Sequence, residues 1–261
     1  MRVEIIDNIT NFSQFEAQNV FQTEELLHLF VHEKGTKIVL FVVYDDCKLT
    51  MIQPVVISRY YRHLPGKLAS FAVAWREPWR NPEMSDDDAC EAFVELTRAI
   101  EKYCRSRALY LEFRHFAEDN IYHTFLISHY KSLPWYNIYR QLGANESVEQ
   151  GMNKSKRKQL RQSFDAGVKV ELNPSSDEIR EWYGLLKRLY RRIHRPLPSV
   201  DVFLRLNELG IGRVFVVIYK GRVVSGSAIL YLLRKAENFQ LSTFNFQLFY
   251  DWYRASIDEQ I

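Results

Sequence analysis

The chain has 261 residues, 47% of them hydrophobic and 14% aromatic, which excludes a disordered protein and is enough for two globular domains. Its net charge is only +3, yet residues 151–195 hold twelve Lys and Arg against five Asp and Glu, a local +7 that leaves −4 for the remainder. This concentration favours one localised anionic partner over general attraction to polyanions.

The first half of the chain reads as helix, three strands, helix and strand. Residues 19–32 have apolar side chains at helical spacing, with Thr23 as the expected N-cap. Three strand-like runs follow, residues 37–44, 49–58 and 69–75. Ser85 and three aspartates open an amphipathic helix that we expect to end near Arg105. Residues 108–114 then alternate as a strand does.

After a link over residues 143–150, a similar order of elements begins again. A basic helix leads into a strand over 168–172, and the run Ser175-Ser176-Asp177-Glu178 caps a helix over about 177–193. A short helix follows with Ser199 as its cap, and a hairpin turns at Lys220-Gly221. The repeated order predicts the α/β (α+β) class, with two tandem domains over residues 1–145 and 146–261.

The basic helix carries five cations in eight residues: Lys154, Lys156, Arg157, Lys158 and Arg161. Leu160 and Phe164 are four residues apart, so we expect them to share a buried face. Gly167 is expected to end the helix in the left-handed conformation. A helix face that is merely solvated is an equally weighted interpretation of such a run of charges.

A second cluster follows on the next helix: Lys187, Arg188, Arg191, Arg192 and Arg195. We expect its apolar neighbours Leu186, Leu189, Tyr190 and Ile193 to contact the core. Like charges on adjacent turns repel, and phosphate is the anion whose geometry suits arginine forks. Two cationic clusters therefore favour a phosphate-bearing ligand over a solvated surface.

Other motifs and localisation signals are sparse. The seven histidines have no metal-ligand spacing, and Asp86, Asp87 and Asp88 are explained by a helix start, so no metal site is expected. The three distant cysteines, Cys47, Cys90 and Cys104, favour neither a disulfide framework nor a zinc knuckle. The start of the chain lacks the design of a secretion signal, and its longest apolar run is too short to span a bilayer. We expect a cytoplasmic protein, with peripheral membrane contact left open.

Several segments resemble the FemAB-like peptidyltransferase or aminoacyltransferase family of the GNAT superfamily. In the second half these are "NKSKRKQLRQSFDAGVKVE", "LYRRIHRPLPSVDVFLRL", "VFVVIYKGRVVSGSAILYL" and "YDWYRASIDEQ". In the first half they are "VFQTEELLHL", "IVLFVVYDDCKLTMIQPVVISR" and "ALYLEFR". The resemblance implies two GNAT-like domains with mixed sheets and transfer of an aminoacyl or acyl group onto an amine. In the best-known members the acceptor is a peptidoglycan precursor.

Three departures from the family pattern shape the expectations. The long helical arm of the tRNA-using members has no counterpart after the basic helix. No pyrophosphate-binding glycine loop is found, which disfavours acyl-CoA and leaves aminoacyl-tRNA as the implied donor, with no tightly bound cofactor. The chain stops soon after "WYRASIDEQ", so we expect a C-terminally truncated, incomplete second domain. Its last strand would be an exposed sheet edge that could pair in a homodimer.

The resulting hypothesis is a FemAB-like N-acyltransferase acting on a cell-envelope, peptidoglycan-type precursor. Its site is predicted to hold phosphate of a nucleotide-sugar or tRNA through four arginines, Arg157, Arg161, Arg191 and Arg195. Tyr190 and Tyr253 are candidates for hydrogen bonds in the groove, and no general base or other catalytic residue can be named. The alternative is an inactive descendant that serves as an RNA- or nucleotide-binding module or as a protein-interaction partner.

Overall fold

The computed structural model divides into unit 1, residues 1–135, and unit 2, residues 136–261. It describes residues 1–7, 15–59, 64, 66–114, 121–133, 149, 151–233 and 246–257. The expected domain boundary between residues 145 and 146 lies outside these ranges. Each unit combines one sheet with helices, so the predicted α/β class is confirmed.

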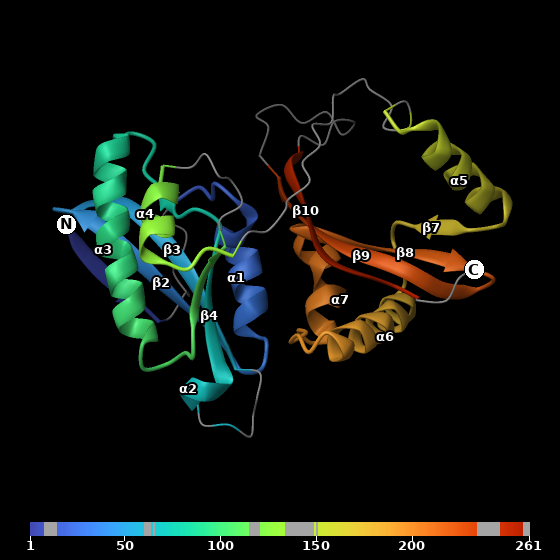
Figure 1. The fold of residues 1–261 in the computed structure, drawn as a ribbon, viewed down its shortest axis with the longest axis horizontal. Helices are drawn as coiled ribbons and strands as arrows, with labels where there is room; N and C mark the ends of the chain where they lie inside the picture. The colour runs from blue at the N-terminus through green and yellow to red at the C-terminus, as the bar shows by residue number, and fades with distance from the viewer. Residues whose placement is uncertain are drawn as a thin grey trace. The chain divides into compact units, whose positions relative to one another are not determined.

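Unit 1 is built on a six-stranded mixed sheet (Figure 1). Its strands are β1 (Arg2–Ile6), β2 (Thr36–Asp45), β3 (Lys48–Arg59), β4 (Ser70–Trp75), β5 (Trp79–Arg80) and β6 (Leu111–Arg114). They pair in the order β1-β2-β3-β4-β6, with β5 beside β3. Among the described strands of this sheet, only β4 and β6 run parallel, and the chain between them contains α3 (Asp86–Cys104).

The remaining helices of unit 1 are η1 (Val20–Gln22), α1 (Glu24–Val31), α2 (Gly66–Ala69) and α4 (His123–His129). Figure 1 shows α1 and α3 on opposite sides of the sheet. Residues 38–43 of β2 are therefore buried at every position, as expected of a strand covered on both faces. The predicted helices and strands of this half are confirmed as α1, α3, β2, β3 and β4, and β6 is shorter than expected.

One irregularity of the sheet lies in β3, where its partner changes. Residues 55–59 of β3 pair with β4, and Met51 and Ile52 pair with β5. Pro54 stands between these two stretches and has no N–H to donate. The fully buried Gln53 compensates, because its Nε2 donates to the carbonyls of Pro54 at 3.1 Å and Trp75 at 3.5 Å.

Unit 2 contains a four-stranded sheet in the order β10-β9-β8-β7. Its elements are α5 (Lys154–Asp165), β7 (Lys169–Glu171), α6 (Ser176–Arg192), α7 (Val200–Leu209), β8 (Gly212–Tyr219), β9 (Arg222–Leu233) and β10 (Phe246–Ser256). These described strands all pair antiparallel, so the mixed pairing expected of both sheets is seen in unit 1 only. The predicted hairpin is confirmed: Lys220 and Gly221 both have positive φ, 50° and 74°, as a tight hairpin turn requires.

The core of unit 2 centres on Trp182 of α6, which is fully buried. Its indole packs edge-on against Phe203 of α7, with ring centroids 5.3 Å apart. On the other side it lies over Gly226 of β9, where a Cβ atom would come within 2.7 Å of its Cδ1. The glycine therefore lets α6 approach the sheet closely. No described helix of either unit is long and apolar enough to cross a membrane.

Replacing Gly226 by Ala tests this close approach. The new Cβ would also lie 2.8 Å from the backbone carbonyl oxygen of Phe215, so the strand or the helix must shift. We expect the free energy of unfolding to fall by about 1–3 kcal/mol in urea titrations. The matched control is Gly184→Ala on α6, where nothing lies within 4 Å of the added methyl and helix propensity favours alanine. Equal stability of the two variants would contradict the packing.

Candidate functional site

The first predicted cationic cluster lies on α5, which begins with Asn153 as its N-cap. The Asn153 side chain accepts a hydrogen bond from the Lys156 N–H at 2.9 Å. Arg157 is half-buried, whereas Arg161 is exposed and pairs with Glu149 at 3.3 Å. Gly167 follows with φ of 89°, as predicted.

The expectation that Leu160 and Phe164 share a buried face is wrong. Their exposed fractions are 38% and 50%, and none of the residues of α5, all of them described, is buried. The two side chains do share one side of the helix, as their spacing requires. What the spacing could not show is how much of that side stays exposed in the folded unit.

The second cluster lies on α6, a helix that starts with a capping box between Ser175 and Glu178. Its buried side is formed by Ile179, Trp182, Leu185 and Leu186. Leu189 and Tyr190 are half-buried as expected, but Ile193 is 48% exposed because it follows the last turn of the helix. The predicted contacts Arg191 and Arg195 are both exposed to solvent.

The two predicted tyrosines are brought together. The ring centroids of Tyr190 and Tyr253 are 5.5 Å apart, so α6 and β10 meet there. Both side chains are half-buried. The backbone carbonyl of Tyr253 accepts a hydrogen bond from the Ser227 hydroxyl, which ties this part of β10 to β9.

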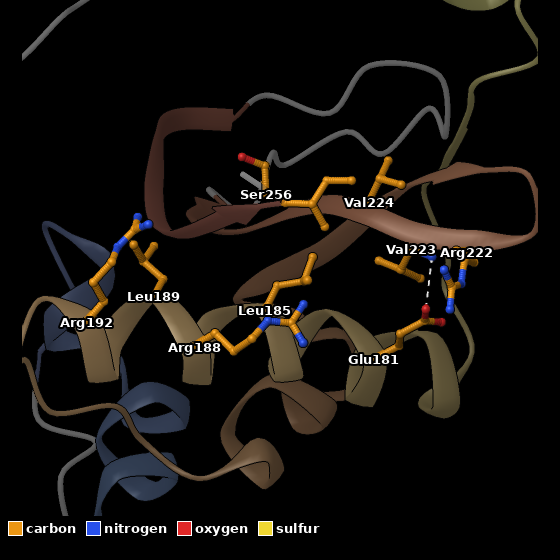
Figure 2. A pocket seen from close by; sticks show the side chains of 10 residues that line it. Glu181, Leu185, Arg188, Leu189, Arg192, Arg222, Val223, Val224 and Ser256 are labelled. Carbon is orange, nitrogen blue, oxygen red and sulfur yellow. Dashed lines mark hydrogen bonds between the residues drawn. The ribbon is translucent and has the colours of Figure 1, made fainter. Parts of the chain in front are cut away.

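A pocket of about 590 Å³ lies between α6 and the strands β9 and β10 (Figure 2). It is lined by Glu181, Leu185, Arg188, Leu189, Arg192, Arg222, Val223, Val224, Ser256 and Ile257. Three of these residues are arginines, and two of the three belong to the predicted cluster. Arg191 and Arg195 do not line this pocket: Arg191 lies about 100° round the helix from Arg192, and Arg195 follows the end of α6.

The helix side of the pocket follows from spacing along α6. Glu181, Leu185, Arg188 and Arg192 are four, three and four residues apart, which places them on one helix face. In Figure 2, Arg188 and Arg192 extend from α6 while Arg222 comes from the start of β9. Sequence reasoning did not single out Glu181 or Arg222. The helical spacing of Glu181 from Arg188 and Arg192 could have placed it on their face of α6. For Arg222 the sequence offers no such signal, because the residue stands next to the hairpin turn.

The strand side of the pocket contains a β-bulge. Val223 pairs with Ile218 and Ser225 with Val217, so Val224 is the additional residue. The Val223 N–H donates to Glu181 Oε1 at 3.2 Å, and the Val224 carbonyl accepts from the Ile257 N–H at 2.9 Å. The bulge thus ties the strand to α6 and to the chain beyond β10, and it fixes the Glu181 carboxylate at the pocket.

The lining suits an anion with a less polar part. Arg188 and Arg192 are one turn apart and repel each other, so a bound anion would relieve that repulsion. Guanidinium groups bind phosphate oxygens through paired charge-assisted hydrogen bonds. Leu185, Leu189 and Val223 supply apolar surface next to them. Within the described ranges, no group of three His, Cys, Asp or Glu residues could hold a metal ion.

No family model and no characterised protein sequence matches this chain. Among solved structures it is similar to a crystal structure of FemX, with a TM-score of 0.48 and 10% identity over 90% of this chain and 75% of that one. It is also similar to L-PGS from Bacillus licheniformis, with a TM-score of 0.39 and 12% identity over 89% and 62% of the two chains. A ribosomal-protein-alanine N-acetyltransferase from Brucella melitensis biovar Abortus 2308 matches with a TM-score of 0.30 and 7% identity, over 54% of this chain and 100% of its own.

FemX belongs to the family that the sequence segments resemble. The three TM-scores lie below 0.5, so these similarities do not show what this chain does.

Proposed function

We propose that this chain is a FemAB-like N-acyltransferase that moves an aminoacyl or acyl group onto an amine of a cell-envelope precursor. The observation that carries the proposal is the pocket of unit 2, in which three arginines and one carboxylate surround a space of about 590 Å³. The arginines would hold the phosphate of the substrate, a nucleotide-sugar or a tRNA. The resemblance of the sequence segments to the FemAB-like family supplies the reaction class.

The chemistry requires little beyond positioning and charge. The substrate amine attacks the acyl carbonyl and the C–N bond forms. The ester bond from that carbon to the oxygen of the donor then breaks, and this oxygen leaves as a hydroxyl with the proton that the amine has lost. The proton lost by the amine needs an acceptor, and Glu181 is the one carboxylate among the described residues that line the pocket. A guanidinium group beside it would stabilise negative charge on the carbonyl oxygen. Binding of the phosphate would hold the amine and the acyl carbonyl close together and correctly oriented.

Titration calorimetry with UDP tests the phosphate site. We expect the Arg188→Gln and Arg222→Gln variants each to weaken UDP binding about tenfold to a hundredfold, since each loses charge-assisted hydrogen bonds. The matched controls are Arg191→Gln and Arg195→Gln, which remove the same charge from residues outside the pocket lining. A larger loss in these controls would support the contacts predicted from sequence and overturn the pocket. No UDP binding by the unmodified protein would remove nucleotides from the proposal.

The alternative, a non-catalytic nucleotide-binding module, is favoured by one observation. Glu181 is the one acid–base group among the described lining residues besides the arginines, and its Oε1 already accepts the Val223 N–H. UDP binding that depends on Arg188 and Arg222, without any transfer by the unmodified protein, would favour this alternative.

A further inference from the structure

Helix α5 presents cations and apolar side chains together. Lys156, Leu160 and Phe164 follow one another at steps of four residues, and Arg157 and Arg161 form the neighbouring line. The remaining positions between the cap and Phe164 include four neutral polar residues, Ser155, Gln159, Gln162 and Ser163. Lys156, Arg157 and Arg161 therefore flank Leu160 and Phe164, whereas Lys154 and Lys158 lie farther round the helix and the four neutral residues occupy the remaining arc.

Two more exposed apolar side chains follow α5 along the chain. The helix ends with hydrogen bonds from Gly167 N–H to the Phe164 carbonyl at 2.9 Å and from Val168 N–H to the Ser163 carbonyl at 3.0 Å. The chain then enters β7, an edge of the described sheet (Figure 1). Val170, the middle residue of β7, is 45% exposed, and Leu172, which directly follows the strand, is 54% exposed.

We propose that this basic apolar surface docks onto an anionic lipid bilayer, with α5 lying along the membrane surface. Lysine and arginine side chains would contact the phosphates of anionic headgroups. Leu160 and Phe164 would enter the boundary between headgroups and acyl chains. Both kinds of side chain are needed for an interfacial helix, and α5 exposes both without burying any residue.

Charge alone would suit a nucleic acid equally well, but the apolar side chains favour the bilayer. Phosphates of RNA would be matched by the cations, and a base could stack on Phe164, but the exposed Leu160, Val170 and Leu172 have no aromatic face for a base. A membrane interface removes Leu160 and Phe164 from water as well as neutralising the cations. The proposal does not depend on the pocket of unit 2.

Vesicle flotation tests the proposal with the full chain. We expect binding to vesicles of phosphatidylcholine with about one-third phosphatidylglycerol, and little binding to phosphatidylcholine alone. The double variant Leu160→Ser, Phe164→Ser should bind the anionic vesicles about tenfold less, because it loses the apolar anchors. The double variant Lys156→Gln, Arg157→Gln should lose about tenfold to thirtyfold, and higher salt should weaken binding of the unmodified protein.

Matched controls come from exposed residues of unit 1. Lys102→Gln with Arg105→Gln removes two cations, and Leu109→Ser with Leu133→Ser removes two exposed leucines. Both controls should bind vesicles as the unmodified protein does, and circular dichroism should show all variants folded. Failure of the unmodified protein to bind anionic vesicles overturns the proposal. So does binding of a labelled RNA that falls with the charge variant, combined with vesicle binding that the Leu160 and Phe164 variant leaves unchanged. Unaltered UDP affinity in the Leu160→Ser, Phe164→Ser variant keeps this outcome separate from that of the pocket.

Discussion

The Glu181→Gln variant is expected to transfer a labelled aminoacyl group from tRNA to a nucleotide-linked peptidoglycan precursor at least about a hundredfold more slowly than the unmodified protein. The amide cannot take the proton that the attacking amine must lose. Its oxygen can still accept the hydrogen bond that the Val223 N–H gives to the carboxylate, so the fold of the pocket is kept. UDP affinity should stay the same or rise up to about threefold, because a negative charge has left a phosphate site.

A suitable control removes a carboxylate of the same helix outside the pocket. Asp177 lies in the first turn of α6, and its side chain is 96% exposed in an ion pair with Arg180. Asp177→Asn should leave transfer and UDP binding unchanged. If Glu181→Gln transfers at the normal rate while the arginine variants lose UDP binding, the pocket is a binding site and the proton acceptor lies elsewhere.

The Trp182→Ala variant is expected to lower the free energy of unfolding of unit 2 by about 3–5 kcal/mol. The indole is fully buried between Phe203 and Gly226, so its removal leaves a cavity between α6 and the sheet. Trp182 Nε1 has no hydrogen-bond partner among the described residues, so the loss is one of packing. Trp182→Phe should therefore cost much less, about 1 kcal/mol, since it keeps an aromatic ring and removes a buried donor.

Hydrogen exchange followed by mass spectrometry locates the effect. Protection should fall in peptides from α6, α7, β8 and β9, and it should stay unchanged in β2 and β3, which belong to the separate core of unit 1. An equal loss of protection in both units would show that they unfold together. A Trp182→Phe variant as unstable as Trp182→Ala would show that the indole makes a polar contact that matters.

Local signals in the sequence were enough to predict most of the helices and strands. Strands β2 and β3 are apolar, β-branched and bounded by turn residues, and α3 has an acidic first turn after Ser85, whose hydroxyl accepts the Asp88 N–H. Helix α4 was missed because Tyr122 occupies its cap position and makes no side-chain cap. Strand β1 was missed because its five residues form a strand only through pairing with β2 across the sheet.

The site was only partly predictable, because it depends on how α6 sits against the sheet. The composition of the cluster indicated an anion, but the packing of α6 on the sheet, with Trp182 over Gly226, determines which of the arginines line the pocket. Arg222 joins them through the hairpin, a contact that no local pattern contains. The burial expected of Leu160 and Phe164 failed for the same reason: amphipathic spacing defines a face of α5 but not the surface that covers it.

The change of partner along β3 couples two neighbouring positions of the chain. Proline at position 54 withdraws a donor from the sheet, and the amide at position 53 supplies one from its side chain to the Trp75 carbonyl. An apolar residue at position 53 would leave the Trp75 carbonyl without this hydrogen bond. A residue with a backbone N–H at position 54 would make the side-chain amide of residue 53 unnecessary. The effects of substitutions at positions 53 and 54 on stability should therefore not be additive, because the effect of either one depends on the residue at the other.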